Sequence, residues 1–181
     1  FLSTILNEKD KIQENLIFMA GGKGLRLRPL TNNMPKPMIK INGKPLLEKL
    51  ILDASNQGFV NFTISINYLA NKIKNYFKEG KKFGVSINYV KERAPLGTAG
   101  SLGNLNYDKI SDNFIVANSD LVTNINYKKL LNFHYKNKSD LTLAYKPVFT
   151  KHSYSVILNN GIHLKSIKEK PTTEINYGIG I

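Results

Sequence analysis

A glycine-rich segment near the start of the chain combines residues that suit phosphate binding. Residues 20–31 read AGGKGLRLRPLT and directly follow the apolar run NLIFM at residues 15–19. A glycine-rich turn after a buried strand exposes backbone N–H groups, and the missing Cβ atoms let a phosphate come close to them. We therefore expect this segment to bind a ligand that carries phosphate groups.

Two common phosphate-binding motifs do not fit this segment. The Walker A pattern G-x-x-x-x-G-K-[ST] is absent from it. The dinucleotide fingerprint G-x-G-x-x-G would start with Gly22 and Gly24, but Leu27 stands where the third glycine belongs. Prolines at positions 29, 35 and 37 also prevent a helix from starting directly after the glycines. A P-loop and a dinucleotide-binding turn are therefore both excluded.

Basic side chains accompany the glycines. Arg26 follows the last glycine of the segment by two positions, and Lys36 stands between two prolines. Flanking prolines restrict the backbone, which suits a cation that must be aimed at developing negative charge. The plainer interpretation is a surface loop with incidental basic residues, and for a single lysine that interpretation is favoured.

The combination of these features is specific. The stretch GGKGLRLRPLT, followed by PKPMIKINGKPLLE, resembles the signature of the sugar-1-phosphate nucleotidylyltransferases, from about Leu16 to the end of the chain. The resemblance implies that Arg26 and Lys36 contact the triphosphate of an NTP and stabilise its transferred α-phosphate. Leu25 departs from the family, which usually has Thr or Ser there. By the same resemblance, the nucleotide-binding residues of this segment are Met19, Ala20, Gly21, Gly22, Lys23 and Gly24.

A second motif is assigned to the nucleobase. Residues 92–100 read ERAPLGTAG and follow a predicted strand, and small residues at a helix N-terminus favour a ligand close to the backbone. A loop with a glycine hinge is the alternative. The resemblance places Glu92 at the base edge, with Gly97 and Thr98 in the loop that closes over the base. Since a carboxylate accepts from both N1–H and the exocyclic amine of guanine, Glu92 favours GTP. UTP, dTTP and CTP stay open as alternatives.

Asp120 is the predicted metal ligand. It follows the apolar run FIVA and an Asn-Ser pair, at the carboxyl end of a predicted parallel strand, where ligands of such sheets bind. The resemblance implies that Asp120 holds Mg²⁺ against the NTP phosphates, and Mg²⁺ commonly takes one or two carboxylates plus substrate phosphates. The second metal aspartate of the family would lie beyond Ile181. A helix N-cap is the alternative role, but the next predicted helix begins too far downstream.

The sugar-phosphate side is predicted from two later motifs. Glu169 and Lys170 belong to the sequence EKP, which resembles a family motif that binds sugar hydroxyls and the sugar phosphate, respectively. Asn176 and Gly178 belong to the sequence NYGI, which resembles the next sugar-contacting segment. Ser155 replaces a glycine that many members carry, so the identity of the sugar stays open.

These motifs require elements that bring them together. Apolar runs predict strands at residues 15–19, 62–66, 85–90 and 113–117, and amphipathic spacing predicts helices from Pro45 to before Gly58 and at residues 71–79, 97–105 and 127–137. Alternating strands and helices predict a Rossmann-like α/β fold of three layers (α/β/α) around a mixed, mostly parallel sheet. After residue 139, short strands at 141–146, 155–158, 164–168 and 177–181 predict an antiparallel addition.

The ends of the chain suggest how it is organised. The chain starts with Phe1 rather than Met, and it stops inside a predicted strand. We therefore expect residues 1–14 to be a linker that remains from an upstream region. We expect residues 15–181 to form a nucleotidyltransferase catalytic domain that is incomplete at its C-terminus.

Composition limits the partners. The formal net charge is +13, from 26 Lys and Arg against 13 Asp and Glu, but the lysines are scattered over predicted helix faces. This pattern favours a solvated basic surface or polyphosphate substrates over a nucleic acid. No run approaches the roughly 20 apolar residues that span a bilayer, so no membrane partner is expected. The absence of Cys excludes disulfides and thiolate metal sites and fits a cytoplasmic location.

The predicted function is nucleotidyl transfer. The expected reaction joins an NTP, with GTP favoured, to a hexose- or hexosamine-1-phosphate, uses Mg²⁺, and yields an NDP-sugar and pyrophosphate. It needs no protein nucleophile, because an oxygen of the sugar phosphate attacks the NTP. Two interpretations from other classes stay open: a catalytically silent regulatory or nucleotide-binding subunit of the same fold, and a nucleic-acid binder. A homo-oligomer is compatible with the sequence.

Overall fold

The computed structural model describes residues 11–92 and 100–181 of the chain. The chain divides into two compact units, Phe1–Thr142 and Leu143–Ile181. The first unit contains a parallel sheet with its helices, and the second consists of paired antiparallel strands.

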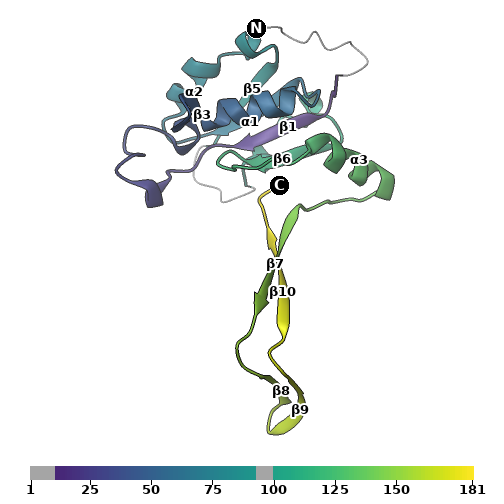
Figure 1. Cartoon of the computed structure of the whole chain (residues 1–181). Helices are drawn as coiled ribbons and strands as arrows, with labels where there is room; N and C mark the ends of the chain where they lie inside the picture. Colours follow the sequence, from purple (N-terminus) through teal and green to yellow (C-terminus); the bar gives the residue numbers. More distant parts are fainter. Residues whose placement is uncertain (1–10, 93–99) are drawn as a thin grey trace. The chain divides into compact units, whose positions relative to one another are not determined.

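The first unit is built on a four-stranded parallel sheet with the order β5-β4-β1-β6 (Figure 1). Its strands are β1 (Asn15–Met19), β4 (Asn61–Ile66), β5 (Ser86–Lys91) and β6 (Phe114–Asn118). The chain runs outward from β1 through β4 to β5 and then returns to the other side of β1. This order creates a switch point between β1 and β6, because the chain adds β4 and β5 on one side of β1 and β6 on the other.

The two central strands explain why the sequence shows nearly continuous apolar runs. Leu16, Ile17 and Phe18 of β1 are at most 1% exposed, so both faces of the strand are covered. The rings of Phe18 and Phe62 stack with their centroids 6.2 Å apart, which joins β1 to β4 on one face of the sheet. The core of the first unit therefore lies against these two strands.

Helices and short segments connect the strands of the sheet. Helix α1 (Leu46–Ser55) buries Leu47, Ile51 and Ala54 completely, at the i, i+4 and i+7 positions of one face. The other helices are α2 (Ala70–Phe77) and α3 (Tyr127–Asn137). The short elements are the 3₁₀ helices η2 (Leu25–Leu27), η3 (Lys36–Met38), η4 (Lys81–Phe83), η5 (Gly100–Asn104) and η6 (Tyr107–Lys109) and the small antiparallel pair β2 (Lys40–Ile41) and β3 (Lys44–Pro45).

Most predicted elements of the first unit are confirmed, and the limits of β1 and α3 agree with the prediction. The helix predicted over residues 97–105 is wrong in its described part, because Gly100–Asn104 forms a 3₁₀ helix. Two glycines in five residues disfavour an α-helix there. Residues 97–99 lie outside the described part of the chain.

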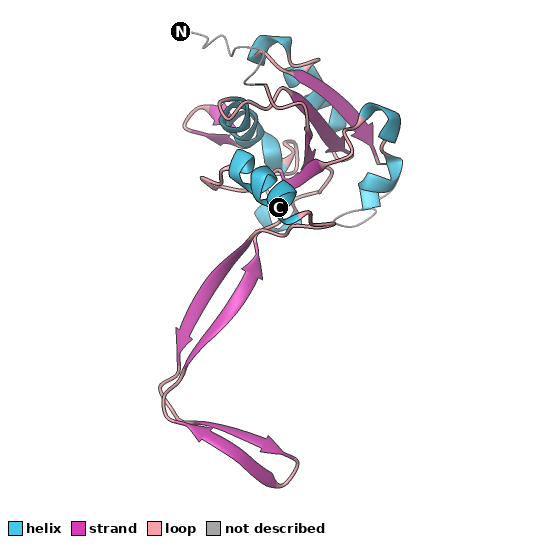
Figure 2. Cartoon of the chain, turned by 90° about the vertical axis from the view of Figure 1, so that its right-hand side faces the viewer, coloured by secondary structure: helices cyan, strands magenta, loops and turns pink. Residues whose placement is uncertain are grey.

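The second unit is a ribbon of paired strands (Figure 2). Strand β7 (Tyr145–Lys151) pairs with β10 (Thr172–Gly178), and β8 (Val156–Asn160) pairs with β9 (His163–Lys168), both antiparallel. The antiparallel arrangement confirms the prediction, but the strands predicted at 141–146 and 177–181 are displaced. The side chains of β7 and β10 are exposed throughout, so an apolar pattern does not mark where these strands start and stop.

None of the helices in residues 11–92 and 100–181 is long and apolar enough to cross a membrane.

Tyr127 and Tyr76 provide a matched test of how buried polar groups affect this fold. Tyr127 is 2% exposed and packs edge-on against Phe59 at 6.2 Å, and its hydroxyl has no hydrogen-bond partner among the described residues. Burial, with a smaller contribution from the Asp53 carboxylate, raises the pKa of Tyr127 from 10.0 to about 12. In contrast, the hydroxyl of Tyr76 donates to the buried carboxylate of Glu48.

We expect Tyr127→Phe to raise the free energy of unfolding by about 1 kcal/mol, because it removes a buried polar atom that has no partner. Tyr76→Phe should lower the free energy of unfolding by about 1–3 kcal/mol, because it takes a donor from a buried carboxylate. Urea denaturation of both variants measures the difference. Equal losses of stability in the two variants would contradict the assignment of the Tyr127 hydroxyl as unpaired.

Candidate active site

The carboxyl ends of the four parallel strands open into one pocket of about 670 Å³. Met19 ends β1, Asn118 ends β6, and Asn67 and Glu92 directly follow β4 and β5. Ligands of open parallel sheets bind at this edge, beside the switch point of the strand order. The pocket is lined by Met19, Ala20, Gly21, Gly22, Lys23, Gly24, Leu25, Arg26, Leu27, Lys36, Pro37, Asn67, Tyr68, Glu92, Asn118, Ser119 and Asp120.

Gly24 lets the glycine loop touch the segment that carries Lys36. Its φ of 61° is in the left-handed region, which disfavours residues with a Cβ atom. A Cβ atom at this position would lie 3.0 Å from the Thr31 Cγ2 atom and 3.2 Å from the Lys36 Cβ atom. The buried Thr31 strengthens the contact, since its hydroxyl donates to the Gly24 carbonyl oxygen at 2.9 Å. Glycine at position 24 therefore allows the glycine loop to pack directly against Thr31 and Lys36.

Lys36 forms an ion pair with Asp120 across the pocket. Lys36 lies in the one-turn helix η3 between Pro35 and Pro37, and both prolines are buried. Its Nζ atom donates to the Asp120 Oδ2 atom, and the two side chains are 32% and 34% exposed. The structure thus brings together the predicted electrostatic stabiliser and the predicted metal ligand. The N-cap of α3 is Asn126, so Asp120 does not serve as its helix cap.

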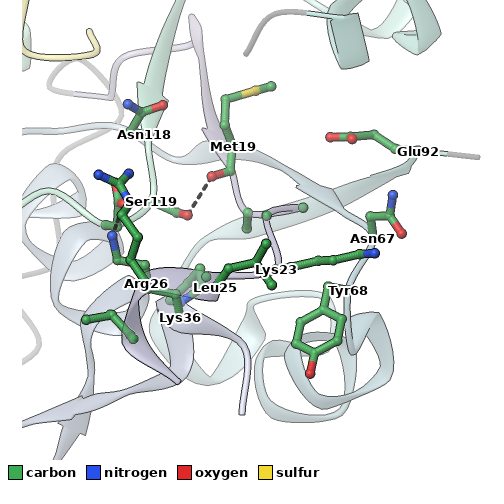
Figure 3. A pocket seen from close by; sticks show the side chains of 17 residues that line it. Met19, Lys23, Leu25, Arg26, Lys36, Asn67, Tyr68, Glu92, Asn118 and Ser119 are labelled. Atoms are coloured by element: carbon green, nitrogen blue, oxygen red, sulfur yellow. Dashed lines mark hydrogen bonds and ion pairs between the residues drawn. The ribbon is translucent and has the colours of Figure 1, made fainter. Parts of the chain in front are cut away.

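Two further cations of the glycine loop line the pocket and have no partner among the residues that the structure describes. Lys23 and Arg26 are exposed, and neither makes a hydrogen bond or ion pair with another described residue. Their charges are therefore available to an anionic ligand, and charge-assisted hydrogen bonds from such groups to phosphate are strong. Arg26 and Lys36 lie on one side of the pocket, whereas Glu92 lies on the opposite side (Figure 3).

Glu92 is a buried acceptor in the wall of the pocket. Glu92 is 7% exposed, and its Oε1 atom accepts a hydrogen bond from the Ser65 hydroxyl at 2.6 Å. The carboxylate also stands directly against Gly21, since a Cβ atom there would lie 2.8 Å from Oε1. The backbone N–H of Glu92 donates to the Ile66 carbonyl oxygen at 3.0 Å, which extends the β4–β5 ladder by one residue. Both ends of this residue are therefore held.

The sequence did not single out Tyr68 and Lys72, which hold the loop between Arg26 and Lys36. The Tyr68 hydroxyl lies 2.6 Å from the carbonyl oxygen of Asn32, to which it donates, and the Lys72 ammonium donates to the carbonyl oxygen of Asn33. Asn67, Asn118 and Ser119 also line the pocket without having been predicted. Their position directly after a parallel strand is the signal that marks them, because ligands bind at that edge.

The remaining predicted residues fall into two groups. Gly97 and Thr98 lie outside the described residues. The predicted sugar-phosphate residues belong to the second unit: Lys170 has a φ of 39° in the turn between β9 and β10, and Glu169 accepts a hydrogen bond from the Ser155 hydroxyl. Asn176 and Gly178 lie on β10. Their role in binding a sugar phosphate stays a prediction.

The pocket suits a hard cation that is shared with a ligand. Within residues 11–92 and 100–181, no group of three or more His, Cys, Asp or Glu side chains is arranged to hold a metal ion by itself. Asp120 is a partly exposed carboxylate at the pocket edge. Mg²⁺ is commonly bound by one or two carboxylates plus substrate phosphates and water. The residues present therefore fit Mg²⁺ that arrives with a phosphate ligand.

The chain is similar in sequence to known proteins. A family model described as "Nucleotidyl transferase" matches residues 15–179. Curated relatives include a mannose-1-phosphate guanylyltransferase of Mycobacterium tuberculosis, 31% identical over 92% of this chain and 48% of the relative. A D-glycero-alpha-D-manno-heptose 1-phosphate guanylyltransferase of Aneurinibacillus thermoaerophilus is 33% identical over 85% of this chain and 66% of the relative. A UTP–glucose-1-phosphate uridylyltransferase of Synechocystis is 32% identical over 91% of this chain and 48% of the relative.

A solved structure gives the same result at the level of the fold. The crystal structure of HddC from Yersinia pseudotuberculosis resembles this chain with a TM-score of 0.70 and 29% identity, and it covers 93% of this chain and 75% of HddC. The chain spans about half the length of the mycobacterial and cyanobacterial relatives. Because the family match includes nearly the whole parallel sheet and the glycine loop, the chain belongs to the nucleotidyl transferase family.

Proposed function

We propose that the protein transfers a nucleotidyl group from an NTP, with GTP preferred, to a sugar-1-phosphate and releases pyrophosphate. The observation that carries this proposal is the division of one pocket into a cationic side, with Arg26 and Lys36, and an opposite side with the buried acceptor Glu92. Such a division suits a ligand with a triphosphate at one end and a hydrogen-bonding base at the other. The activities for which the curated relatives are named support the same reaction class.

The reaction is an in-line displacement at the α-phosphorus. An oxygen of the sugar phosphate bonds to this phosphorus while the bond to the bridging oxygen of the β-phosphate breaks, and pyrophosphate leaves. Catalysis of this kind depends on positioning and on stabilising negative charge rather than on a protein nucleophile. Arg26 and Lys36 neutralise charge on the phosphates, and the backbone N–H groups of residues 21–24 bind them in the glycine loop.

Asp120 would hold Mg²⁺ beside these cations. The bound ion supplies further neutralisation of the phosphates as pyrophosphate departs. The Lys36–Asp120 ion pair supports this assignment, since it brings a cation and the proposed metal ligand together in the pocket. We assign the sugar phosphate to Glu169, Lys170, Asn176 and Gly178, and we assign the protein to the cytoplasm.

Glu92 is proposed to read the base. A carboxylate accepts two hydrogen bonds from guanine, through N1–H and the exocyclic amine, whereas uracil and thymine present one N–H between two carbonyl oxygens. UTP is the second candidate nucleotide, because the Synechocystis relative is a uridylyltransferase.

Loss of either phosphate-binding cation should abolish most of the activity without unfolding the protein. We expect Lys36→Ala and Arg26→Ala each to lower kcat by about 100-fold or more, the loss typical of a group that stabilises transition-state charge. Arg26 is exposed and Lys36 is only partly buried, each in a short 3₁₀ helix, and substitutions of such side chains usually change stability little. Pyrophosphate release by the full-length protein measures kcat. Lys49→Ala, an exposed lysine of α1, is the control, and normal turnover of folded Lys36→Ala would refute the catalytic role.

Asp120→Asn should increase the Mg²⁺ requirement. We expect the Mg²⁺ concentration for half-maximal activity to rise at least about tenfold. Even residues that only hydrogen-bond to a metal ligand lower metal affinity by about this factor when they are replaced. A Mg²⁺ titration of pyrophosphate release compares this variant with Asp108→Asn, whose carboxylate is exposed on η6. An unchanged Mg²⁺ midpoint for Asp120→Asn would remove Asp120 from the metal site.

Glu92→Gln should weaken the preference for GTP. The amide oxygen retains an acceptor for the Ser65 hydroxyl, while the amide N–H₂ offers a donor that suits uracil or thymine. We expect the wild-type protein to prefer GTP over UTP and dTTP by about tenfold to a hundredfold, and the variant to lose most of this ratio. The specificity constants kcat/KM of both proteins for the three nucleotides measure this preference. A wild-type preference for UTP, or an unchanged ranking in Glu92→Gln, would mean that other groups read the base.

A further inference from the structure

We infer that Ser65 determines nucleobase specificity by holding the Glu92 carboxylate in one orientation. Ser65 is a positioning residue: it lies beneath Glu92 on β4 and is not among the residues that line the pocket. This inference rests on the proposed function, because it takes Glu92 as the group that contacts the base.

The Ser65 hydroxyl is a fixed donor. Ser65 is 1% exposed and lies next to Met19 in the register of β4 with β1. Its own carbonyl oxygen accepts from the Ala20 N–H at 2.8 Å, so the backbone that carries the hydroxyl is tied to the start of the glycine loop. The separation of 2.6 Å between the Ser65 Oγ and Glu92 Oε1 atoms is typical of a strong O–H hydrogen bond to a carboxylate.

Gly21 is a second close neighbour of the carboxylate. A Cβ atom at Gly21 would lie 2.8 Å from Oε1, 3.1 Å from Cδ and 3.2 Å from Oε2 of Glu92. The Ser65 hydroxyl and the Gly21 backbone therefore both restrict the position of the carboxylate. The N–H of Glu92, bonded to the Ile66 carbonyl oxygen at 3.0 Å, fixes the other end of the residue.

The two carboxylate oxygens differ in their protein contacts. Oε1 accepts one hydrogen bond from Ser65 and retains a second acceptor site, and no described residue donates a hydrogen bond to Oε2. A restrained carboxylate accepts only from donors at fixed positions, whereas a freely rotating one adapts to donors in several positions. Because the hydroxyl is buried, its hydrogen bond is not replaced by water when it is removed. Ser65 thereby sharpens the choice between bases that differ in their donors.

Strand β4 also supplies a matched control. Thr63 lies two residues before Ser65, on the same face of the strand, and is likewise 1% exposed. Its hydroxyl has no hydrogen-bond partner among the described residues. Thr63→Val and Ser65→Ala both remove a buried hydroxyl from β4, but only the second removes a contact to Glu92.

The experiment measures kcat/KM of the full-length protein with GTP, ITP and UTP. ITP lacks the exocyclic amine of guanine, so the GTP:ITP ratio reports one of the two donors that Glu92 accepts from. We expect Ser65→Ala to lower this ratio by about fivefold to thirtyfold, the equivalent of one hydrogen bond. KM for the sugar-1-phosphate should not change, and Thr63→Val should keep the wild-type ratio.

Two further variants separate positioning from a general structural effect. Gly21→Ala adds a Cβ atom too close to Oε1, which displaces the carboxylate while keeping the Ser65 hydroxyl, and should also lower the GTP:ITP ratio. In the Glu92→Gln background, Ser65→Ala should have a smaller effect on the ratio than in the wild-type background, because the two residues act through one contact.

The outcomes distinguish this inference from the proposed function. A wild-type protein that releases no pyrophosphate with any nucleotide would overturn both. An active wild-type protein whose GTP:ITP ratio is the same in Ser65→Ala, or falls equally in Thr63→Val, would overturn the inference alone.

Discussion

The pairing of β1 with a parallel neighbour on each side is the constraint on which the rest of the site depends. Met19 pairs with Ser65 of β4 and with Asn118 of β6, so three strands end at the same level. The Ser119 hydroxyl donates to the Met19 carbonyl oxygen at 2.5 Å and binds the ends of β1 and β6 together. All groups that follow these strands must therefore meet at one edge of the sheet, which is where the pocket lies.

The close approach of the glycine-loop backbone to other segments then determines which side chains lie together at that edge of the sheet. Gly24 admits Thr31 and Lys36, and Gly21 admits the Glu92 carboxylate, at distances that a Cβ atom would prevent. The same loop thus contacts the segment of Lys36 at Gly24 and the buried carboxylate of Glu92 at Gly21. A loop that is anchored at both ends keeps a fixed spacing between the proposed phosphate-binding cations and the proposed base-contacting carboxylate, as catalysis by positioning would require.

Burial has opposite consequences for the two kinds of charged group in this pocket. Lys23 and Arg26 remain exposed and free of described protein partners, so they can exchange water for phosphate at little structural cost. Glu92 is almost completely buried and needs a protein donor, which Ser65 supplies. The buried acceptor is consequently the more restrained of the two in the position of its side chain.

The sequence by itself determined the fold class, the limits of β1 and α3, and the residues of the glycine loop, because apolar periodicity and glycine and proline positions act locally. It did not determine the Lys36–Asp120 ion pair or the Ser65–Glu92 hydrogen bond. These contacts join residues 84 and 27 positions apart, and they exist only through the register of the parallel strands. The limits of β7 and β10 were also decided by pairing alone, since their side chains are exposed and no buried face marks where either strand begins or ends.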